Sequence, residues 1–180
     1  MTSSTVPFAD IKTPRLRLQP MQAVAHAELL TLWHNAQVRR YLWDNTLVTQ
    51  QQVQAVQQAS DACFARWGCG MYTLTLVSGA HSLAGFCGIR DFEDSGVPEL
   101  LYGIHPDHWG QGLVSEATRA LLEFVFTGCG VARVVAATDT PNQSSVKVMQ
   151  RLGMAFEERK LWHGLDTVFY SLNGDDFVGS

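Results

Sequence analysis

A strand, a glycine pair, a helix and a second strand follow one another in the middle of the chain, and this order constrains the fold most. Residues 97–104 alternate as a strand does, residues 113–127 place apolar side chains on one helical face, and residues 131–138 form a β-branched run. Gly110 and Gly112 lie between the first strand and the helix. Such a crossover predicts two parallel strands joined with right-handed chirality.

The glycine pair predicts a particular kind of binding site. Gly110 and Gly112 can adopt backbone angles closed to other residues, and they leave no side chain in the turn. The amides from Gln111 to Ser115 have no partner inside the helix, and the helix dipole adds positive charge there. This favours a phosphate or pyrophosphate site that needs no lysine. A plain tight turn is the alternative, because the third glycine of a dinucleotide fold and the Walker A motif are both absent.

A second polar segment, DTPNQSS (139–145), follows the strand 131–138. Asn142 is a natural N-cap for a short helix, and Ser145 stands at its third position. The two side chains either only cap this helix or lie beside the glycine turn, where open α/β sheets bind ligands at the carboxyl ends of strands.

The other segments predict one α/β domain over residues 1–180, with a mixed and mostly antiparallel sheet. Residues 1–10 read as a loose lead-in. Capping residues Thr49 and Gln52 mark the start of one helix, and Gly153 marks the end of another. The expected strands are 15–20, 70–78, 82–92, 97–104, 131–138, 154–162 and 166–172, and the expected helices are 21–35, 49–67, 113–127 and a short one ending at Leu152.

Charge and cysteine content exclude several classes of function. There are 13 Lys and Arg against 17 Asp and Glu, so the formal net charge is −4 and nucleic acid or an anionic membrane is a poor partner. No apolar stretch is long enough to span a bilayer, and the N-terminus does not resemble a signal peptide. The four cysteines form no C-x-x-C pair, which indicates reduced thiols and a cytoplasmic protein.

Three segments in order, TPRLRLQP, PELLYGIHPDHWGQGLVSEA and NQSSVKVMQRLGM, resemble the GNAT acetyltransferases. The branch that they look most like is the RimJ/RimL-type ribosomal-protein N-acetyltransferases. The resemblance covers about residues 13–172. It implies a GNAT fold of about seven strands and about four helices, with the sheet splayed between strands 97–104 and 131–138. Acetyl-CoA would lie in that cleft as cosubstrate.

The resemblance also implies which residues hold the coenzyme. The main chain of the glycine turn would hold the pyrophosphate, the strand edge would pair with the pantetheine arm, and Asn142 would contact that arm. Val114 departs from the pattern, since the family has Gly or Ala there. The predicted coenzyme-binding residues are Tyr102, Gly103, Ile104, Gly110, Gln111, Gly112, Leu113, Val114, Ser115 and Asn142.

Acyl transfer to an amine needs a base and, less strongly, an acid. Glu99 is the predicted base, and its alternative role is to fix a loop or a substrate cation. Ser145 would lie near the thioester sulfur as the candidate acid, and a strand amide near Tyr102 or Gly103 would stabilise the oxyanion. No metal is predicted, because the H-x-x-H of His105 and His108 has no further ligands at suitable spacing.

Two elements have alternative interpretations that concern the acceptor. The loop 90–99 is either a negative rim that attracts a cationic amine or an ordinary solvated turn. Trp33, Tyr41, Trp43 and Trp67 are either core residues or the acceptor wall that the resemblance implies.

Two functions therefore remain. The first is an N-acetyltransferase that acts by direct transfer in a ternary complex, with a protein N-terminus or a small amine as acceptor. The second is a non-catalytic acyl-CoA-binding sensor or interaction module. The final hairpin offers an edge strand through which a homodimer can form.

Overall fold

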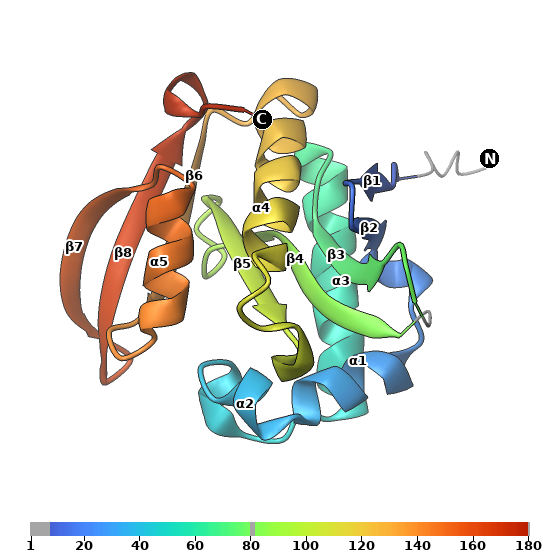
Figure 1. Ribbon diagram of the computed structural model, residues 1–180. Helices are drawn as coiled ribbons and strands as arrows, with labels where there is room; N and C mark the ends of the chain where they lie inside the picture. The colour runs from blue at the N-terminus through green and yellow to red at the C-terminus, as the bar shows by residue number, and fades with distance from the viewer. Residues whose placement is uncertain (1–7, 80–81, 180) are drawn as a thin grey trace.

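The computed structural model describes residues 8–79 and 82–179, and within them one eight-stranded sheet organises the chain (Figure 1). The strand order is β1-β2-β3-β4-β5-β6-β8-β7. All neighbours are antiparallel except β5 and β6, which are parallel as predicted. The strands are β1 (Ile11–Lys12), β2 (Leu16–Pro20), β3 (Met71–Leu76), β4 (Leu83–Asp91), β5 (Pro98–Ile104), β6 (Arg133–Asp139), β7 (Ala155–Trp162) and β8 (Leu165–Asn173).

Helices cover both faces of this sheet. In Figure 1, α4 and α5 lie on the face toward the viewer, and α3 lies behind the sheet. Each face has its own apolar core. Leu121 and Met149 pack in one, and Leu29, Trp33 and Phe86 pack in the other. The helices are α1 (His26–His34), α2 (Ala36–Arg39), α3 (Gln50–Trp67), α4 (Leu113–Glu123) and α5 (Gln143–Arg151).

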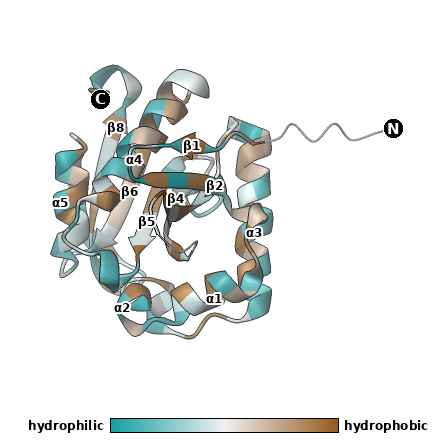
Figure 2. Ribbon diagram, turned by 45° about the vertical axis from the view of Figure 1, so that its right-hand side comes forward, coloured by the Kyte–Doolittle hydropathy of each residue, from teal (hydrophilic) through white to brown (hydrophobic). Residues whose placement is uncertain are grey.

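The helices are amphipathic, as their sequence spacing predicts. Figure 2 shows hydrophobic and hydrophilic residues on the same helices, for example on α1 and α2. On α4, Leu113, Ala117 and Leu121 are buried against the sheet, while Glu123 is exposed. Burial of that apolar face, rather than helix propensity alone, fixes the position of α4 and therefore of its first turn.

The sheet opens between β5 and β6, and this confirms the predicted splay. The register between these strands is the single pair Glu99 and Val135, at the start of β5. Among the described residues, the β6-facing edge of β5 has no strand partner from Leu100 to Ile104. A parallel pair that separates in this way leaves unpaired backbone groups along a cleft.

The sequence prediction is wrong at several element boundaries. Residues 21–35 do not form one helix, because Val24 is extended and Ala25 is the N-cap of α1, so Met21–Ala23 forms a separate 3-10 turn. The helix predicted over 113–127 changes to a π-helical turn at Phe124. The two-residue β1 and the short helix α2 were not predicted. Thr49 and Gln52 form the predicted capping box, and Gly153 has the left-handed conformation expected after α5.

Candidate active site

The splayed strands enclose a cavity of about 660 Å³, which we call the cleft cavity. Its walls come from β5 and β6, from the turn before α4, from the start of α5 and from the region around α2. It brings together all the predicted coenzyme-binding residues except Gln111, which belongs to the same turn but does not line the cavity. Residues that lie far apart in the sequence thus surround one space.

The turn before α4 has the geometry that the glycine pair predicts. Gly110 and Gly112 have φ angles of 73° and 72°, in the left-handed region that favours glycine. Gly112 is the N-cap of α4, and no side chain caps it. Among the described residues, none accepts a hydrogen bond from the backbone amides of positions 110 to 115. These amides, at the positive end of the α4 dipole, are available to an anion.

The charges on the cleft cavity are all of one sign. Arg40, Lys147 and Arg151 line it, and no Asp or Glu is found among its described lining residues. The sequence left open whether Lys147 and Arg151 approach a bound coenzyme, and it gave no reason to expect Arg40 there. A cavity whose charged lining residues are all cationic, in a chain of net charge −4, is suited to an anionic ligand.

Arg15 is a further residue that the sequence analysis missed. Its Nη1 donates to the carbonyl of Gln111 at 2.9 Å, and its Nε donates to Glu116 Oε2 at 2.6 Å. Burial alone would raise the pKa of Glu116, but hydrogen bonds from Thr13 and Arg15 lower it. Arg15 therefore ties the glycine turn to β2 and offsets the negative charge of Glu116 in the first turn of α4.

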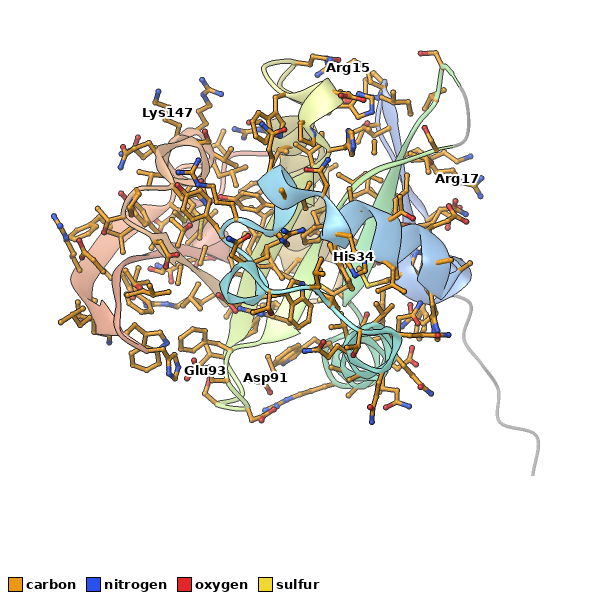
Figure 3. All side chains as sticks on the ribbon, turned by 90° about the horizontal axis from the view of Figure 1, so that it is seen from below. Arg15, Arg17, His34, Asp91, Glu93 and Lys147 are labelled. Atoms are coloured by element: carbon orange, nitrogen blue, oxygen red, sulfur yellow. The ribbon has the colours of Figure 1, made fainter. Side chains whose placement is uncertain are left out.

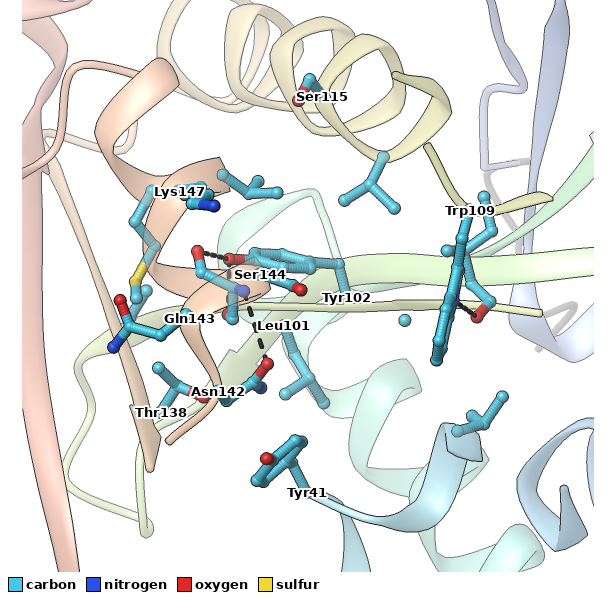
Figure 4. Close-up of a pocket in the computed structure, with 18 of the residues that line it drawn as sticks. Tyr41, Leu101, Tyr102, Trp109, Ser115, Thr138, Asn142, Gln143, Ser144 and Lys147 are labelled. Carbon is cyan, nitrogen blue, oxygen red and sulfur yellow. Dashed lines mark hydrogen bonds between the residues drawn. The ribbon is translucent and has the colours of Figure 1, made fainter. Parts of the chain in front are cut away.

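Two hydroxyl groups meet across the cleft cavity. The Tyr102 hydroxyl donates to the Ser145 carbonyl at 3.0 Å and lies 2.8 Å from Ser145 Oγ (Figure 4). Burial raises the pKa of Tyr102 to about 12, against the opposing effect of the Ser145 hydrogen bond. Asn142 caps α5 by accepting from the Ser145 amide at 3.4 Å. Asn142 therefore caps α5 as predicted, and both Asn142 and Ser145 also line the cleft cavity beside the glycine turn.

Glu99 is buried, with 2% of its surface exposed, and its Oε2 accepts from Arg90 Nε at 2.5 Å. Burial raises the pKa of this carboxyl, and the Arg90 guanidinium opposes that rise. The direction agrees with the sequence argument for a base. Glu99 itself does not line the cleft cavity, whereas Leu101, two residues further along β5, does.

A second cavity, of about 510 Å³, lies between α3 and the sheet, and we call it the aromatic cavity. Trp33, Trp43, Trp67 and Phe86 line it. The Trp33 ring contacts both Trp43 and Phe86, at centroid distances of 5.7 and 5.8 Å. Trp33 is thus a core residue that also forms a wall.

The two cavities share Leu42 and Leu101 as lining residues, and Glu99 lines neither of them. Tyr41, which the sequence analysis grouped with the three tryptophans, lines the cleft cavity instead.

Most acidic side chains of the loop 90–99 are paired, so the negative rim that its composition allows is reduced to Asp94. Asp91 pairs with Arg66 at 3.0 Å, and Glu93 pairs with His163 at 2.6 Å. These partners come from α3 and from the turn between β7 and β8, so the sequence of the loop alone could not indicate them.

Glu99 is likewise paired within the protein, which leaves Asp94 as the acidic residue of this loop without a partner among the described residues. Within the same part of the chain, no group of three His, Cys, Asp or Glu residues is placed to hold a metal ion. No helix of residues 8–79 and 82–179 is long and apolar enough to cross a membrane.

Comparison with known families decides the class. Residues 15–155 match the model of the acetyltransferase (GNAT) domain. The chain belongs to the GNAT acetyltransferase family. A curated relative, the uncharacterized N-acetyltransferase p20 of Bacillus licheniformis, is 23% identical over 174 residues, which are 93% of this chain and 97% of the relative.

Solved structures agree with this assignment at the level of the fold. A GNAT-family acetyltransferase from Bordetella pertussis superposes with a TM-score of 0.76 at 24% identity, covering 91% of this chain and 98% of that one. RimL, a ribosomal L7/L12 alpha-N-protein acetyltransferase solved in complex with coenzyme A, superposes with a TM-score of 0.74 at 20% identity, covering 92% and 98%. This GNAT protein is therefore an acetyltransferase enzyme with a mixed α/β fold, and that fold uses acetyl-CoA.

Proposed function

We propose that this GNAT protein transfers the acetyl group of acetyl-CoA to a primary amine by direct attack in a ternary complex. The observation that carries the proposal is the cleft cavity. Beside it lie the six backbone amides of positions 110 to 115, which have no partner in the described part of the chain, and three cationic side chains but no carboxylate are among its described lining residues. Coenzyme A is a polyanion with a long neutral arm, and these features complement both parts of it.

The residues present fit the coenzyme. The amides of Gly110 to Ser115 would hold the pyrophosphate. Lys147 and Arg151, which line the cavity from α5, would pair with the remaining phosphate of the coenzyme. The free edge of β5 at Tyr102, Gly103 and Ile104 would pair with the amide groups of the pantetheine arm. Val114 lines the cavity, and the role proposed for it here needs only its main chain.

Glu99 is the base in this proposal, and it accepts the proton that the attacking amine loses. Burial keeps its carboxylate basic, while the pair with Arg90 holds it in place. Arg90 lines the aromatic cavity, so a water chain beside Arg90 is the route that we propose for the proton.

As the C–N bond forms and the C–S bond breaks, the Ser145 hydroxyl donates its proton to the leaving sulfur and takes up in exchange the second proton that the nitrogen loses when the tetrahedral intermediate collapses. The Ser145 hydroxyl is in turn hydrogen-bonded to the neutral Tyr102 hydroxyl. A backbone amide near Tyr102 or Gly103 stabilises the oxyanion.

Two measurements test the proposal. Acetyl-CoA at 100 times its Kd should stabilise the protein by about 2.7 kcal/mol, whereas NAD and ATP at the same concentration should have a smaller effect. Thiol release with a panel of primary amines should then exceed the rate without amine. If acetyl-CoA binds and no amine in the panel increases thiol release, the proposed transfer to a primary amine is wrong.

The acceptor in this proposal is either a protein N-terminus or a small amine. The fold similarity to RimL supports the first class, and the aromatic cavity supports the second. A cytoplasmic location and a homodimer through the outer edge of β7 stay predictions. Sedimentation equilibrium tests the dimer.

A further inference from the structure

The aromatic cavity adjoins the cleft cavity at the strand where the acetyl group would be presented. Leu42 and Leu101 line both cavities, from two separate elements. An amine held in the aromatic cavity is therefore separated from the cleft cavity by the side chains of Leu42 and Leu101. The inference that follows rests on the proposed function, since it concerns the acceptor of the same reaction.

The wall of the aromatic cavity is unsuited to a peptide. Most of its described lining residues are apolar, and four of them are the rings of Trp33, Trp43, Trp67 and Phe86. A peptide bound there would bury backbone N–H and C=O groups with few partners, and each such group costs free energy when it is left unpaired. Flat apolar groups, in contrast, gain from contact with aromatic rings.

The helix α3 supplies the room for such a group. Ala55, Ala59 and Ala62 line the cavity on one side of the helix, and all three are exposed. Their spacing of four and three residues places them on one helical face. The cavity volume of about 510 Å³ lies within the range of roughly 300–1,000 Å³ that is usual for small-molecule sites.

The charge balance of the cavity favours a cation. Arg66 and Arg90 line it, but Arg66 pairs with Asp91 and Arg90 pairs with Glu99. Asp94 also lines it and has no partner among the described residues. Figure 3 shows Asp91 and Glu93 on one side of the molecule and Arg15 and Lys147 on the other. An uncompensated carboxylate and several aromatic faces both attract an ammonium group.

We infer that the acceptor is a small primary amine carried on a flat aromatic body, and that the aromatic cavity binds it. The ring lies against α3 and the tryptophans, and the ammonium group is attracted by Asp94 before it loses its proton. The N-terminus of a peptide chain is a poor acceptor, because the cavity offers its backbone few hydrogen-bond partners.

The first test compares three probes at saturating acetyl-CoA: 2-phenylethylamine, n-butylamine and a tetrapeptide of alanine and glycine with a free N-terminus. We expect kcat/KM for 2-phenylethylamine to exceed the values for the other two by at least tenfold. Equal values, or a preference for the tetrapeptide, would overturn the inference. The proposed function would survive that result, because thiol release would still depend on an amine.

The second test fills the cavity. Ala59→Leu places a larger side chain in it, and Ala65→Leu adds the same volume at an exposed position of α3 that does not line it. We expect Ala59→Leu to lower kcat/KM for 2-phenylethylamine at least tenfold and to leave the thermal shift by acetyl-CoA unchanged. Ala65→Leu should change neither. An unaltered rate in Ala59→Leu would contradict the inference.

Amine binding can also be measured without turnover. Calorimetry with 2-phenylethylamine alone should detect an affinity that Asp94→Asn weakens about fivefold, since Asn keeps the left-handed backbone of Asp94, with φ at 57°, and removes the charge. Absence of binding to the wild-type protein would overturn the inference even if no amine were turned over. Absence of an acetyl-CoA thermal shift would instead overturn the proposed function.

Discussion

The cleft cavity and the aromatic cavity flank the same strand, yet they differ in charge, in wall and in backbone geometry. Three cations and a row of unpaired amides characterise the first. Aromatic rings characterise the second, and both of its arginines are paired with carboxylates. In the proposals made above, strand β5 separates the site of an anionic carrier from the site of a cationic acceptor. Backbone amides contribute to the first site together with its cations, whereas side chains alone distinguish the second.

The largest expected effect on kcat is that of replacing Glu99, on the strand β5 between the two cavities. Glu99→Gln should lower kcat by about 10²–10⁴-fold, since a general base contributes about that much. Steady-state kinetics with a saturating amine measure it. The acetyl-CoA thermal shift should be unchanged, which would place Glu99 outside the cleft cavity in function as well as in space.

The pH profile sharpens the same assignment. The carboxylate is the active form, so kcat/KM of the wild-type protein should fall as the pH falls through the Glu99 pKa, which burial raises above the usual value for glutamate. Glu99→Gln should remove this dependence, and the exposed Glu123→Gln on α4 should keep it. Wild-type turnover in Glu99→Gln would show that Glu99 only positions the loop.

The next largest effect is expected at the glycine turn. Gly112→Val should weaken coenzyme A binding about 100-fold, or about 2.7 kcal/mol, because the turn cannot keep its left-handed geometry and its amides move. Gly130→Val is the matched control: Gly130 has a φ of 67°, its added side chain would have open space, and it does not line the cleft cavity. If calorimetry shows that both variants bind coenzyme A as the wild type does, the backbone of the glycine turn does not bind the coenzyme.

The cations of the cleft cavity should contribute less. Lys147→Ala and Arg151→Ala should each weaken coenzyme A binding about fivefold at low salt, and the effect should shrink as ionic strength rises, since exposed charges are screened. Lys12→Ala, on β1 and outside both cavities, controls for net charge. Equal losses in all three variants would mean that the overall charge, and not the cavity, attracts the coenzyme.

The smallest expected effect concerns the two hydroxyl groups. Tyr102→Phe removes the hydroxyl that hydrogen-bonds to both the carbonyl and the Oγ of Ser145, so we expect the free energy of unfolding to fall by about 1–2 kcal/mol and kcat to fall about threefold. Chemical denaturation and steady-state kinetics measure the two quantities. A loss of several hundredfold in kcat would instead make Tyr102 the proton donor itself.

Local chemistry made part of this site predictable. Gly110, Gly112 and Asn142 act through their own backbone or through the next turn of helix, so their roles can be derived from spacing. The parallel pair of β5 and β6 followed in the same way from the crossover between them.

Other parts depend on contacts between distant segments. Arg15 reaches Gln111 across 96 residues, and Glu93 meets His163 across 70. No local pattern encodes these pairs, and for this reason the sequence could not decide between a negative rim and an ordinary turn for the loop 90–99. The aromatic cavity could not be predicted from the sequence either, because the packing of α3 on the sheet decides which tryptophans line a cavity.

Backbone amides before α4 are proposed to hold the diphosphate of the coenzyme, and the function of the whole cleft depends on them. Titration of the ¹⁵N-labelled protein with coenzyme A, followed by amide chemical shifts, tests this most directly. We expect the amides of Gly112 to Ser115 to shift downfield together and to saturate at one Kd, while those of Ala55 and Ala59 on α3 stay unchanged. Saturable binding that leaves the amide chemical shifts of Gly112 to Ser115 unchanged would contradict the proposed role of these amides.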